Sequence, residues 1–440
     1  MTSYSLRIDR LNRLKQTIRL HEQQVLDALS KDLGKSPEEA YLTEVGYIYN
    51  EIDSSIKNLA KWMRPKRVPG SWLIFPSKSA IEFKPKGVVL IIAPWNYPFQ
   101  LCLAPLVGAI AAGNTCILKP SEEAVETGQV IARMMASCFS EQEIEVVLGG
   151  VEATQKLFER KLDHLFFTGS THVGRLLMIE AAKSLIPVTL ELGGKSPCLI
   201  YDCSELELAA RRIAWGKLLN SGQTCVAPDY VLIQKGQKDA FMNFFKSAVE
   251  SMYGSEPIQS HDYGSIINDR HYDRLVSLTA GLKTESESFN KASRKIAPIL
   301  IPLERESQSA LMKDEIFGPL LPIIEIDSFE EGLEFIQKRD RPLAAYFFSS
   351  SQSLLTSFTQ KILAGGICLN DVVVHLTNKN LPFGGIGPSG MGAYHGYFSF
   401  ETFSHQQAVV TRSFWFENRL RYPPYKGKLS LFKRLLAWFS

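Results

Sequence analysis

The sequence places one cysteine where a nucleophile could be presented to a substrate. Cys225 lies in the polar run NSGQTCVAPDY, residues 220–230, with no second cysteine, histidine or acidic residue nearer than Asp229. A thiolate is a strong nucleophile, but a free thiol with a pKa of about 8.5 is mostly neutral at physiological pH. Two interpretations stay open from the local sequence: Cys225 is a catalytic nucleophile, or it is a small apolar side chain in a loop.

Two polar residues at the ends of apolar segments could assist such a nucleophile. Asn96, in APWNYPF, follows an apolar run, and its amide could donate a hydrogen bond to an oxyanion. Glu191, in LELGGKSP, lies between Leu190 and Leu192, where a carboxylate could be a general base with a raised pKa. Each has an ordinary alternative, because asparagine forms turns and a glutamate at a strand end is commonly a solvated charge.

Two motifs carry residue types that bind nucleotides. In CILKPSE, Lys119 and Glu122 could bond to ribose hydroxyls; the alternative is a surface loop in which Ser121 is a helix N-cap. In FFTGSTHVGR, the stretch 169–174 opens a helix after a strand, where backbone N–H groups can bind phosphate. The G-x-G-x-x-G fingerprint is absent, so the motif alone does not support the common mode of dinucleotide binding.

A third motif could contact a sugar and a flat ring. In KDEIFGPLLP, Glu315 could bond to a sugar and Phe317 could pack on a ring, before a Gly-Pro turn and an apolar run. The alternative is a plain loop between a helix and a strand. Taken singly, none of these motifs decides the function.

The elements that must position these residues are read from the apolar pattern. Residues 5–64 have helical spacing, with a first helix ending at Gly34, and residues 71–87 are typical of a β-hairpin. From residue 87 to 169, short apolar strands alternate with helices, which predicts a parallel, doubly wound sheet with a ligand site at the carboxyl ends of its strands. A second α/β block follows, with strands expected at 230–235, 321–326 and 344–350.

Composition narrows the class of protein. A net charge of +3 over 440 residues gives no reason to expect nucleic acid as a partner. The seven cysteines include no C-x-x-C pair, which makes a zinc site improbable and favours reduced thiols. The N-terminus has no apolar signal-peptide core, so we expect a cytoplasmic protein.

The last twelve residues, LSLFKRLLAWFS, form an apolar segment with Lys433 and Arg434 in its middle. As a helix they could lie on a membrane surface or cap an apolar tunnel. The favoured interpretation is a C-terminal helix docked on its own protein.

Taken in order, seven motifs closely resemble the aldehyde dehydrogenase superfamily: PWNYPF, GNTCILKPSE, FFTGSTHVG, LELGGKSP, GQTCVAPDY, EIFGPLLP and LPFGGIGPSGMG. The resemblance runs from about residue 5 to 425, and the short N-terminus with CVAPDYV and GMGAYHGYFSFETFSH is similar to the class-three branch. Pro388 departs from the small polar residue expected in its loop.

The resemblance implies an α/β fold made of three parts. These are a Rossmann-like cofactor-binding domain (1–72 and 87–190), an α/β catalytic domain (191–376) and a β-hairpin oligomerisation element (73–86 and 377–412), followed by a C-terminal tail (413–440). In the class-three branch the assembly is typically a homodimer.

The resemblance also assigns roles. It implies that Cys225 is the nucleophile, that Glu191 activates water, and that Asn96 and the Cys225 backbone N–H form the oxyanion hole. No metal is implied. The cofactor would be NAD, with NADP also possible, and the residues that match cofactor-binding positions are Trp95, Lys119, Glu122, Gly169, Ser170, Thr171, His172, Val173, Gly174, Leu192, Glu315 and Phe317.

The expected reaction is the oxidation of an aldehyde, medium- to long-chain aliphatic or aromatic, to a carboxylic acid. One alternative is a dehydrogenase that transfers its acyl group to coenzyme A, and Glu191 argues against it because such enzymes generally lack this residue. The other is a non-catalytic structural protein such as a lens crystallin, which the presence of Cys225, Glu191 and Asn96 makes improbable.

Overall fold

The computed structural model describes residues 2–71, 74–282 and 288–439. The N-terminal region is helical, with α1 (Tyr4–Leu33), α2 (Pro37–Ala40), a π-helical turn (Tyr41–Val45) and α3 (Gly46–Trp62). The predicted end of the first helix is confirmed: Gly34 has φ +63°, and its N–H donates to the carbonyl of Ser30. Glycine accepts this left-handed conformation without strain.

The first six-stranded sheet has the order β16-β7-β6-β3-β4-β5. Its strands are β3 (Val88–Ile92), β4 (Thr115–Lys119), β5 (Ile144–Val146), β6 (His164–Gly169), β7 (Val188–Leu192) and β16 (Gly390–Met391). All pair in parallel except β16, which runs antiparallel to β7. The helices between them are α4 (Gln100–Ala112), α5 (Val125–Cys138), α6 (Val151–Leu157) and α7 (Thr171–Lys183). The predicted doubly wound sheet is confirmed.

The order of this sheet reverses between β3 and β6. From β3 the chain goes outward to β4 and β5, and then returns to form β6 on the other side of β3. Ligands bind at such a switch point, outside the carboxyl ends of the strands, because the flanking loops separate there.

The second sheet has six parallel strands in the order β12-β13-β9-β8-β14-β15. They are β8 (Pro197–Ile200), β9 (Tyr230–Gln234), β12 (Ile299–Leu303), β13 (Leu320–Ile326), β14 (Ala344–Phe348) and β15 (Gly366–Leu369). The helices of this part are α8 (Leu206–Leu218), α9 (Lys238–Tyr253), α10 (Asp269–Ser277), α11 (Phe329–Gln337) and α12 (Gln352–Lys361), and a small ribbon pairs β10 (Phe289–Asn290) with β11 (Lys295–Ile296). The strands β9, β13 and β14 confirm the predicted ones.

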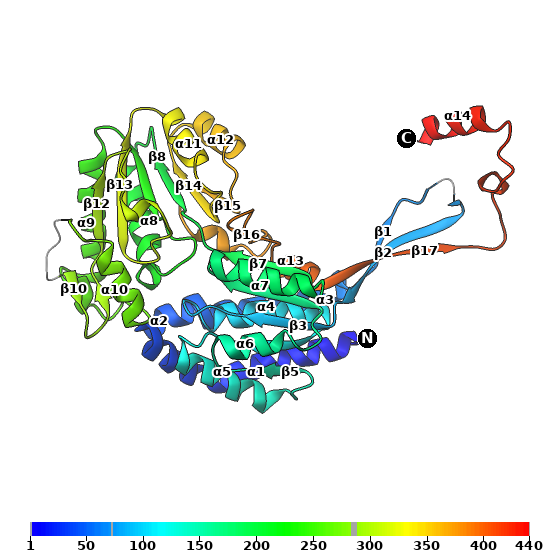
Figure 1. Ribbon diagram of the computed structural model, residues 1–440, viewed down its shortest axis with the longest axis horizontal. Helices are drawn as coiled ribbons and strands as arrows, with labels where there is room; N and C mark the ends of the chain where they lie inside the picture. The colour runs from blue at the N-terminus through cyan, green and yellow to red at the C-terminus, as the bar shows by residue number, and fades with distance from the viewer. Residues whose placement is uncertain (1, 72–73, 283–287, 440) are drawn as a thin grey trace.

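A third sheet projects from these two layers, as Figure 1 shows. It contains β1 (Lys66–Val68), β2 (Ser77–Pro85) and β17 (Ser404–Arg412), all antiparallel, and β17 pairs with the whole of β2. The expectation of a complete hairpin within residues 71–87 is therefore wrong. That segment supplies one strand, and its partners come from the residues before it and from the end of the chain after α13 (Gly396–Thr402).

The C-terminal helix α14 (Leu429–Phe439) lies apart from both six-stranded sheets (Figure 1). No side chain from Leu429 to Trp438 is buried, and Trp438 is 82% exposed. The expectation that this tail docks on its own chain is therefore wrong. No helix in the described part of the chain is long and apolar enough to span a bilayer.

Candidate active site

A cavity of about 740 Å³ lies where the two six-stranded sheets face each other. It brings together most of the residues that the sequence pointed to, namely Trp95, Asn96, Gly169, Ser170, Thr171, His172, Glu191, Leu192, Cys225, Glu315 and Phe317. Four of the expected cofactor-binding residues do not line it: Lys119, Glu122, Val173 and Gly174.

Cys225 is half-buried in the cavity wall, just after a left-handed turn. Asn220, Ser221 and Gly222 have φ values of +52°, +53° and +80°. A left-handed conformation costs a non-glycine residue about 1–2 kcal/mol, so this turn must be held by its surroundings. Only glycine fits at its last position, because a Cβ on Gly222 would lie 2.4 Å from the carbonyl oxygen of Gly318.

Asn96 follows β3 and is fixed against this turn. Its Nδ2 donates to the carbonyl of Gln223 at 3.0 Å, and its own carbonyl accepts from Asn220 Nδ2 at 2.7 Å. The carbonyl also accepts from Lys35 Nζ at 3.3 Å, and Lys35 forms a fully buried ion pair with Glu44 at 2.5 Å. Because an amide has two N–H groups, one N–H of Asn96 remains for a ligand in the cavity that Cys225 also lines.

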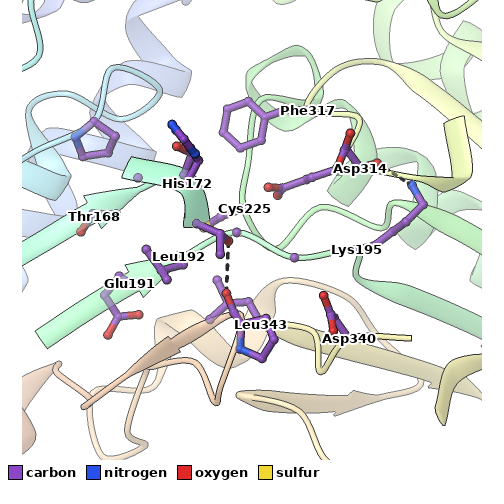
Figure 2. Close-up of a pocket in the computed structure, with 18 of the residues that line it drawn as sticks. Thr168, His172, Glu191, Leu192, Lys195, Cys225, Asp314, Phe317, Asp340 and Leu343 are labelled. Atoms are coloured by element: carbon purple, nitrogen blue, oxygen red, sulfur yellow. Dashed lines mark hydrogen bonds between the residues drawn. The ribbon is translucent and has the colours of Figure 1, made fainter. Parts of the chain in front are cut away.

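Glu191 is at the carboxyl end of β7 and is 2% exposed. Neither of its carboxylate oxygens has a hydrogen-bond partner among the described residues. Burial raises the pKa of Glu191 well above its usual value, since a charged carboxylate loses its hydration there. Figure 2 shows Glu191 and Phe317 on opposite sides of Cys225 in this view.

The surroundings of Cys225 disfavour its thiolate in this state. Burial raises the pKa of the thiol, and the nearby carboxylates of Glu315 and Glu191 raise it further. The backbone N–H groups of Cys225 and Val226 act in the opposite direction, because they are directed at the sulfur. All seven cysteines are free.

Glu315 and Phe317 precede β13 and face the loop after β7. Glu315 rests directly on Gly193, where a Cβ would come within 2.0 Å of its Oε2. Burial raises the pKa of Glu315 well above its usual value, and the charge of Asp229 adds to this. Phe317 has φ +53° and meets the Trp95 ring edge-on, with the ring centroids 5.3 Å apart.

An ionic network that the sequence analysis missed holds the loop of Glu315. Asp229 accepts from Lys195 Nζ at 2.6 Å and from the backbone N–H of Ile316 at 3.1 Å. Lys217 lies 3.9 Å from the same carboxylate and is 1% exposed, and burial lowers its pKa to about 8. Lys195 also donates to the carbonyl of Asp314 (Figure 2). Lys195 lies in the motif LELGGKSP and Asp229 in GQTCVAPDY, so two members of this network could have been found from the motifs.

Two missed residues of the cavity come from α10, far from any motif. The His271 ring lies 4.8 Å from the Trp95 ring, and burial lowers the pKa of His271 to about 4. Arg274 donates to the carbonyl of Ile316 at 2.6 Å, which ties α10 to the Glu315 loop. The sequence carried no signal for either residue, because only the fold brings α10 beside the carboxyl end of β3.

Lys119 lies at the carboxyl end of β4, away from the cavity lining. It is buried, donates to the carbonyl of Pro120 and lies 3.4 Å from Glu122 Oε2. The alternative in which Ser121 is a helix N-cap is wrong, since α5 begins only at Val125. Asp32 of α1 caps this helix instead, and its carboxylate accepts from the backbone N–H groups of residues 126 and 127.

The stretch 169–174 forms the expected helix start. Ser170 is the N-cap of α7, and its side chain accepts from the N–H of Val173. Gly174 has a packing role, since a Cβ there would lie 2.6 Å from a methyl group of Leu192. Thr171 donates to the carbonyl of Pro388 at 3.1 Å, so the departure at Pro388 leaves this contact intact.

Comparisons with known proteins agree with this geometry. Residues 1–409 match the model of the aldehyde dehydrogenase family. The chain is 43% identical to a protein of Staphylococcus aureus named 4,4'-diaponeurosporen-aldehyde dehydrogenase, over 99% of this chain and 95% of that one. It is also 43% identical to the dimeric NADP-preferring aldehyde dehydrogenase of Rattus norvegicus, over 97% and 95% of the two chains.

Solved structures give the same result. The substrate-bound state of AldH from S. aureus superposes with a TM-score of 0.95 at 42% identity, over 100% of this chain and 96% of that one. An indole-3-acetaldehyde dehydrogenase solved with NAD⁺ has a TM-score of 0.82 at 22% identity and shares the fold.

Proposed function

The chain belongs to the aldehyde dehydrogenase family, and we propose that it oxidises aldehydes to carboxylic acids through Cys225, Asn96 and Glu191. One observation carries the proposal. A single cavity holds a thiol, an amide with a spare N–H and a carboxylate without a partner among the described residues, each from a different segment of the chain.

In the first step, the Cys225 sulfur attacks the aldehyde carbon. A C–S bond forms, the carbonyl oxygen becomes an oxyanion, and the thiol proton leaves to solvent or to a neighbouring base. The spare N–H of Asn96 and the Cys225 backbone N–H stabilise that oxyanion. Such preplaced donors are effective because they need no reorganisation when the charge develops.

The residues around the cavity fit a nicotinamide dinucleotide. The Thr168 hydroxyl, which has no partner among the described residues, suits a polar group of the cofactor. The close approach of Gly193 to Glu315 and the rings of Trp95 and Phe317 suit a sugar and a flat ring. When bound, the dinucleotide accepts a hydride from the carbon attached to Cys225. The start of α7 would hold its pyrophosphate, since helix N–H groups favour anions.

Glu191 completes the reaction. After oxidation the substrate is a thioester on Cys225, and a water must be deprotonated to attack it. A carboxylate with a raised pKa is a strong base once ionised, and the absence of a fixed partner among the described residues leaves both its oxygens for that water. The carboxylic acid then leaves and the thiol is restored.

The finer choices of substrate and cofactor follow from the same residues. Glu122 would bond to a free 2′-hydroxyl, but its side chain is 48% exposed and can turn away from a 2′-phosphate, which Lys119 could pair with. We propose that NAD is preferred and NADP is also used. Aromatic and aliphatic cavity residues such as Leu101 and Phe383 favour medium- to long-chain or aromatic aldehydes. The name of the S. aureus relative gives 4,4'-diaponeurosporen-aldehyde as the aldehyde of that protein.

The assembly we propose is a homodimer. The projecting sheet of β1, β2 and β17 gives a natural contact, and the name of the rat relative describes that protein as dimeric.

The test is an assay of reduced nicotinamide formation with aldehydes of graded chain length, with each dinucleotide, and with or without coenzyme A. The proposal expects the free acid as product, with no effect of coenzyme A. A coenzyme A thioester as the product would support the acylating alternative instead, and no aldehyde-dependent reduction at all would reject both.

A further inference from the structure

A short helical segment outside the cavity contacts both loops of the candidate oxyanion site. This segment, residues 35–44, which we call the support segment, follows α1 and contains α2 and most of the π-helical turn. None of its residues is among those that line the cavity. Three of its charged side chains nevertheless contact the loop after β3 or the turn before Cys225, namely Lys35, Glu39 and Glu44. The support segment therefore holds the two loops from behind.

Lys35 and Glu44 fix the loop after β3 at three backbone atoms. Lys35 Nζ donates to the carbonyl of Asn96 at 3.3 Å. Glu44 Oε2 accepts from the N–H groups of Phe99 at 2.9 Å and Gln100 at 3.2 Å. The other carboxylate oxygen of Glu44 accepts from Lys35, and both side chains are fully buried. Because a buried charge without its partner is strongly destabilising, the two side chains keep these positions.

Glu39 fixes the turn that precedes Cys225. Its Oε1 accepts from the backbone N–H of Asn220 at 2.7 Å, at the first left-handed residue of the turn. The side chain of Asn220 donates at 2.7 Å to the same Asn96 carbonyl that Lys35 contacts. The loop and the turn are thus joined to each other and to the support segment.

The π-helical turn explains how one short segment reaches both places. In a regular α-helix, Glu39 and Glu44 would lie about 140° apart around the axis, since they are five residues apart. Here the N–H of Gly46 donates to the carbonyl of Tyr41, five residues earlier, as in a π-helix. The wider turn reduces the angle, so both carboxylates reach the site. Single π-helical turns are rare and are frequently found at functional sites.

We propose that Lys35, Glu39 and Glu44 are positioning residues for aldehyde oxidation, which direct the spare N–H of Asn96 and the N–H of Cys225 at the same substrate oxygen. They act through the loop and the turn, and they touch no reacting atom. A displaced oxyanion donor loses its effect, so disturbing the support segment should slow formation of the thioester without weakening dinucleotide binding. The inference rests on the proposed function.

The first experiment removes the anchor of the Asn96 carbonyl and keeps the buried site neutral. In Lys35→Met/Glu44→Gln, the amide oxygen introduced at position 44 can still accept the two N–H groups at the start of α4, so mainly the contact with Asn96 is lost. Formation of reduced dinucleotide is followed in a single turnover with enzyme in excess of aldehyde. We expect its rate to fall about 10- to 100-fold, with the Kd of the dinucleotide unchanged.

A double-mutant cycle with Asn96→Ala tests whether the pair acts through that residue. In the Asn96→Ala background, Lys35→Met/Glu44→Gln should lower the single-turnover rate much less, because the donor that the pair positions is already gone. Lys238→Met/Glu325→Gln is the matched control and should leave the rate unchanged. That Lys–Glu pair is half-buried, its carboxylate also accepts a backbone N–H, and it does not line the cavity.

A second experiment compares two substitutions of Glu39. Glu39→Gln keeps an acceptor for the N–H of Asn220 and should retain the wild-type rate, whereas Glu39→Met removes the acceptor and should lower the single-turnover rate. Rescue by the conservative change shows that the hydrogen bond matters. If circular dichroism shows the Lys35→Met/Glu44→Gln variant to be unfolded, this comparison decides alone.

Three outcomes would overturn the inference: an unchanged single-turnover rate in folded Lys35→Met/Glu44→Gln, the same fold-loss with and without Asn96→Ala, or equal rates in the two Glu39 variants. A loss of dinucleotide affinity as large as the loss of rate would also contradict it, because it would indicate general damage to the cavity. An unchanged rate in Asn96→Ala itself would reject the donor assigned in the proposed function, and the inference with it.

Discussion

The two six-stranded sheets supply the candidate active site from opposite ends of their strands. In the first sheet, the residues follow the strands: Asn96 comes after β3, Gly169 ends β6, and Glu191 lies at the end of β7. In the second sheet they precede the strands, as Cys225 comes before β9 and Glu315 before β13. The cavity lies where the carboxyl ends of one sheet meet the amino ends of the other.

This difference shows two ways of positioning a functional residue. At the carboxyl ends of the first sheet, the switch in strand order opens a crevice, and the starts of the following helices line it. No such rule applies to the amino ends of the second sheet. There, the Cys225 turn and the Glu315 loop are held by side chains, through the Lys35–Glu44 pair behind Asn96 and through Asp229.

The largest effect should come from the nucleophile of the second sheet. We expect Cys225→Ala to lower aldehyde oxidation by a factor on the order of 10⁴ or more, since no other group can form the thioester. Binding of the dinucleotide, followed by the quenching of protein fluorescence, should survive. Cys203→Ala is the control at another half-buried cysteine. Turnover retained in Cys225→Ala would contradict the role of Cys225 as the nucleophile.

The second largest effect should come from Asn96, the hydrogen-bond donor that follows β3 of the first sheet. Asn96→Ala should lower kcat by about 100- to 1,000-fold, as the loss of an oxyanion donor does elsewhere. Because Asn96 also supports the turn through its contact with Gln223, Asn220→Ala serves as a comparison that removes support but no donor to substrate. Equal losses in both variants would mean that Asn96 acts only on the turn.

The ionic network should have a smaller effect on activity. Asp229→Asn frees the loop of Glu315 and leaves Lys195 and Lys217 without their carboxylate, so we expect the KM for the dinucleotide to rise about tenfold and stability to fall by about 3–5 kcal/mol. Asp327→Asn, in an exposed pair with Lys235, is the control. If the aldehyde KM rose and the dinucleotide KM did not, the network would have a different role.

The smallest effect should be the dependence of protein stability on pH that burial of Glu191 causes. The folded state raises the pKa of Glu191 above its value of 4.5 in the unfolded chain, so it binds this proton more tightly. Wild-type stability then falls by up to about 1.4 kcal/mol per pH unit as pH rises from 4.5 to the folded pKa, and Glu191→Gln lacks this loss. The unfolding midpoint of Glu191→Gln should exceed that of wild type increasingly with pH. Glu334→Gln, at a 67% exposed site, should show no such trend, and a constant difference would contradict the buried charge.

Much of the first sheet could be predicted, because short strands that are apolar throughout and alternate with helices have few other arrangements. The pattern also predicts a ligand site at the carboxyl ends of these strands, and it places Asn96 and Glu191 each at the end of an apolar segment. The local sequence of Cys225 could not decide between a catalytic nucleophile and a small apolar side chain. Only the resemblance joined it to Glu191, because strands far apart in the chain bring the two together.

What could not be predicted depends on contacts between distant segments. Lys217 looks like any lysine of an amphipathic helix until α8 packs beside Asp229, and the helix cap at α5 comes from Asp32, more than ninety positions away from its partners. The prediction for the C-terminal tail, residues 413–440, was wrong for a different reason. Its apolar pattern favoured docking on the chain, but an apolar face says only that it will be covered, not by what.

We propose that Cys225 forms the thioester and that Glu191 activates the water that removes it. Intact-mass spectrometry of Glu191→Gln, mixed with an aldehyde and dinucleotide and then quenched, tests this directly. We expect one acyl group added to the protein, on the peptide that contains Cys225, with a burst of reduced dinucleotide equal in amount to the enzyme. Steady turnover without any acyl-protein would contradict it.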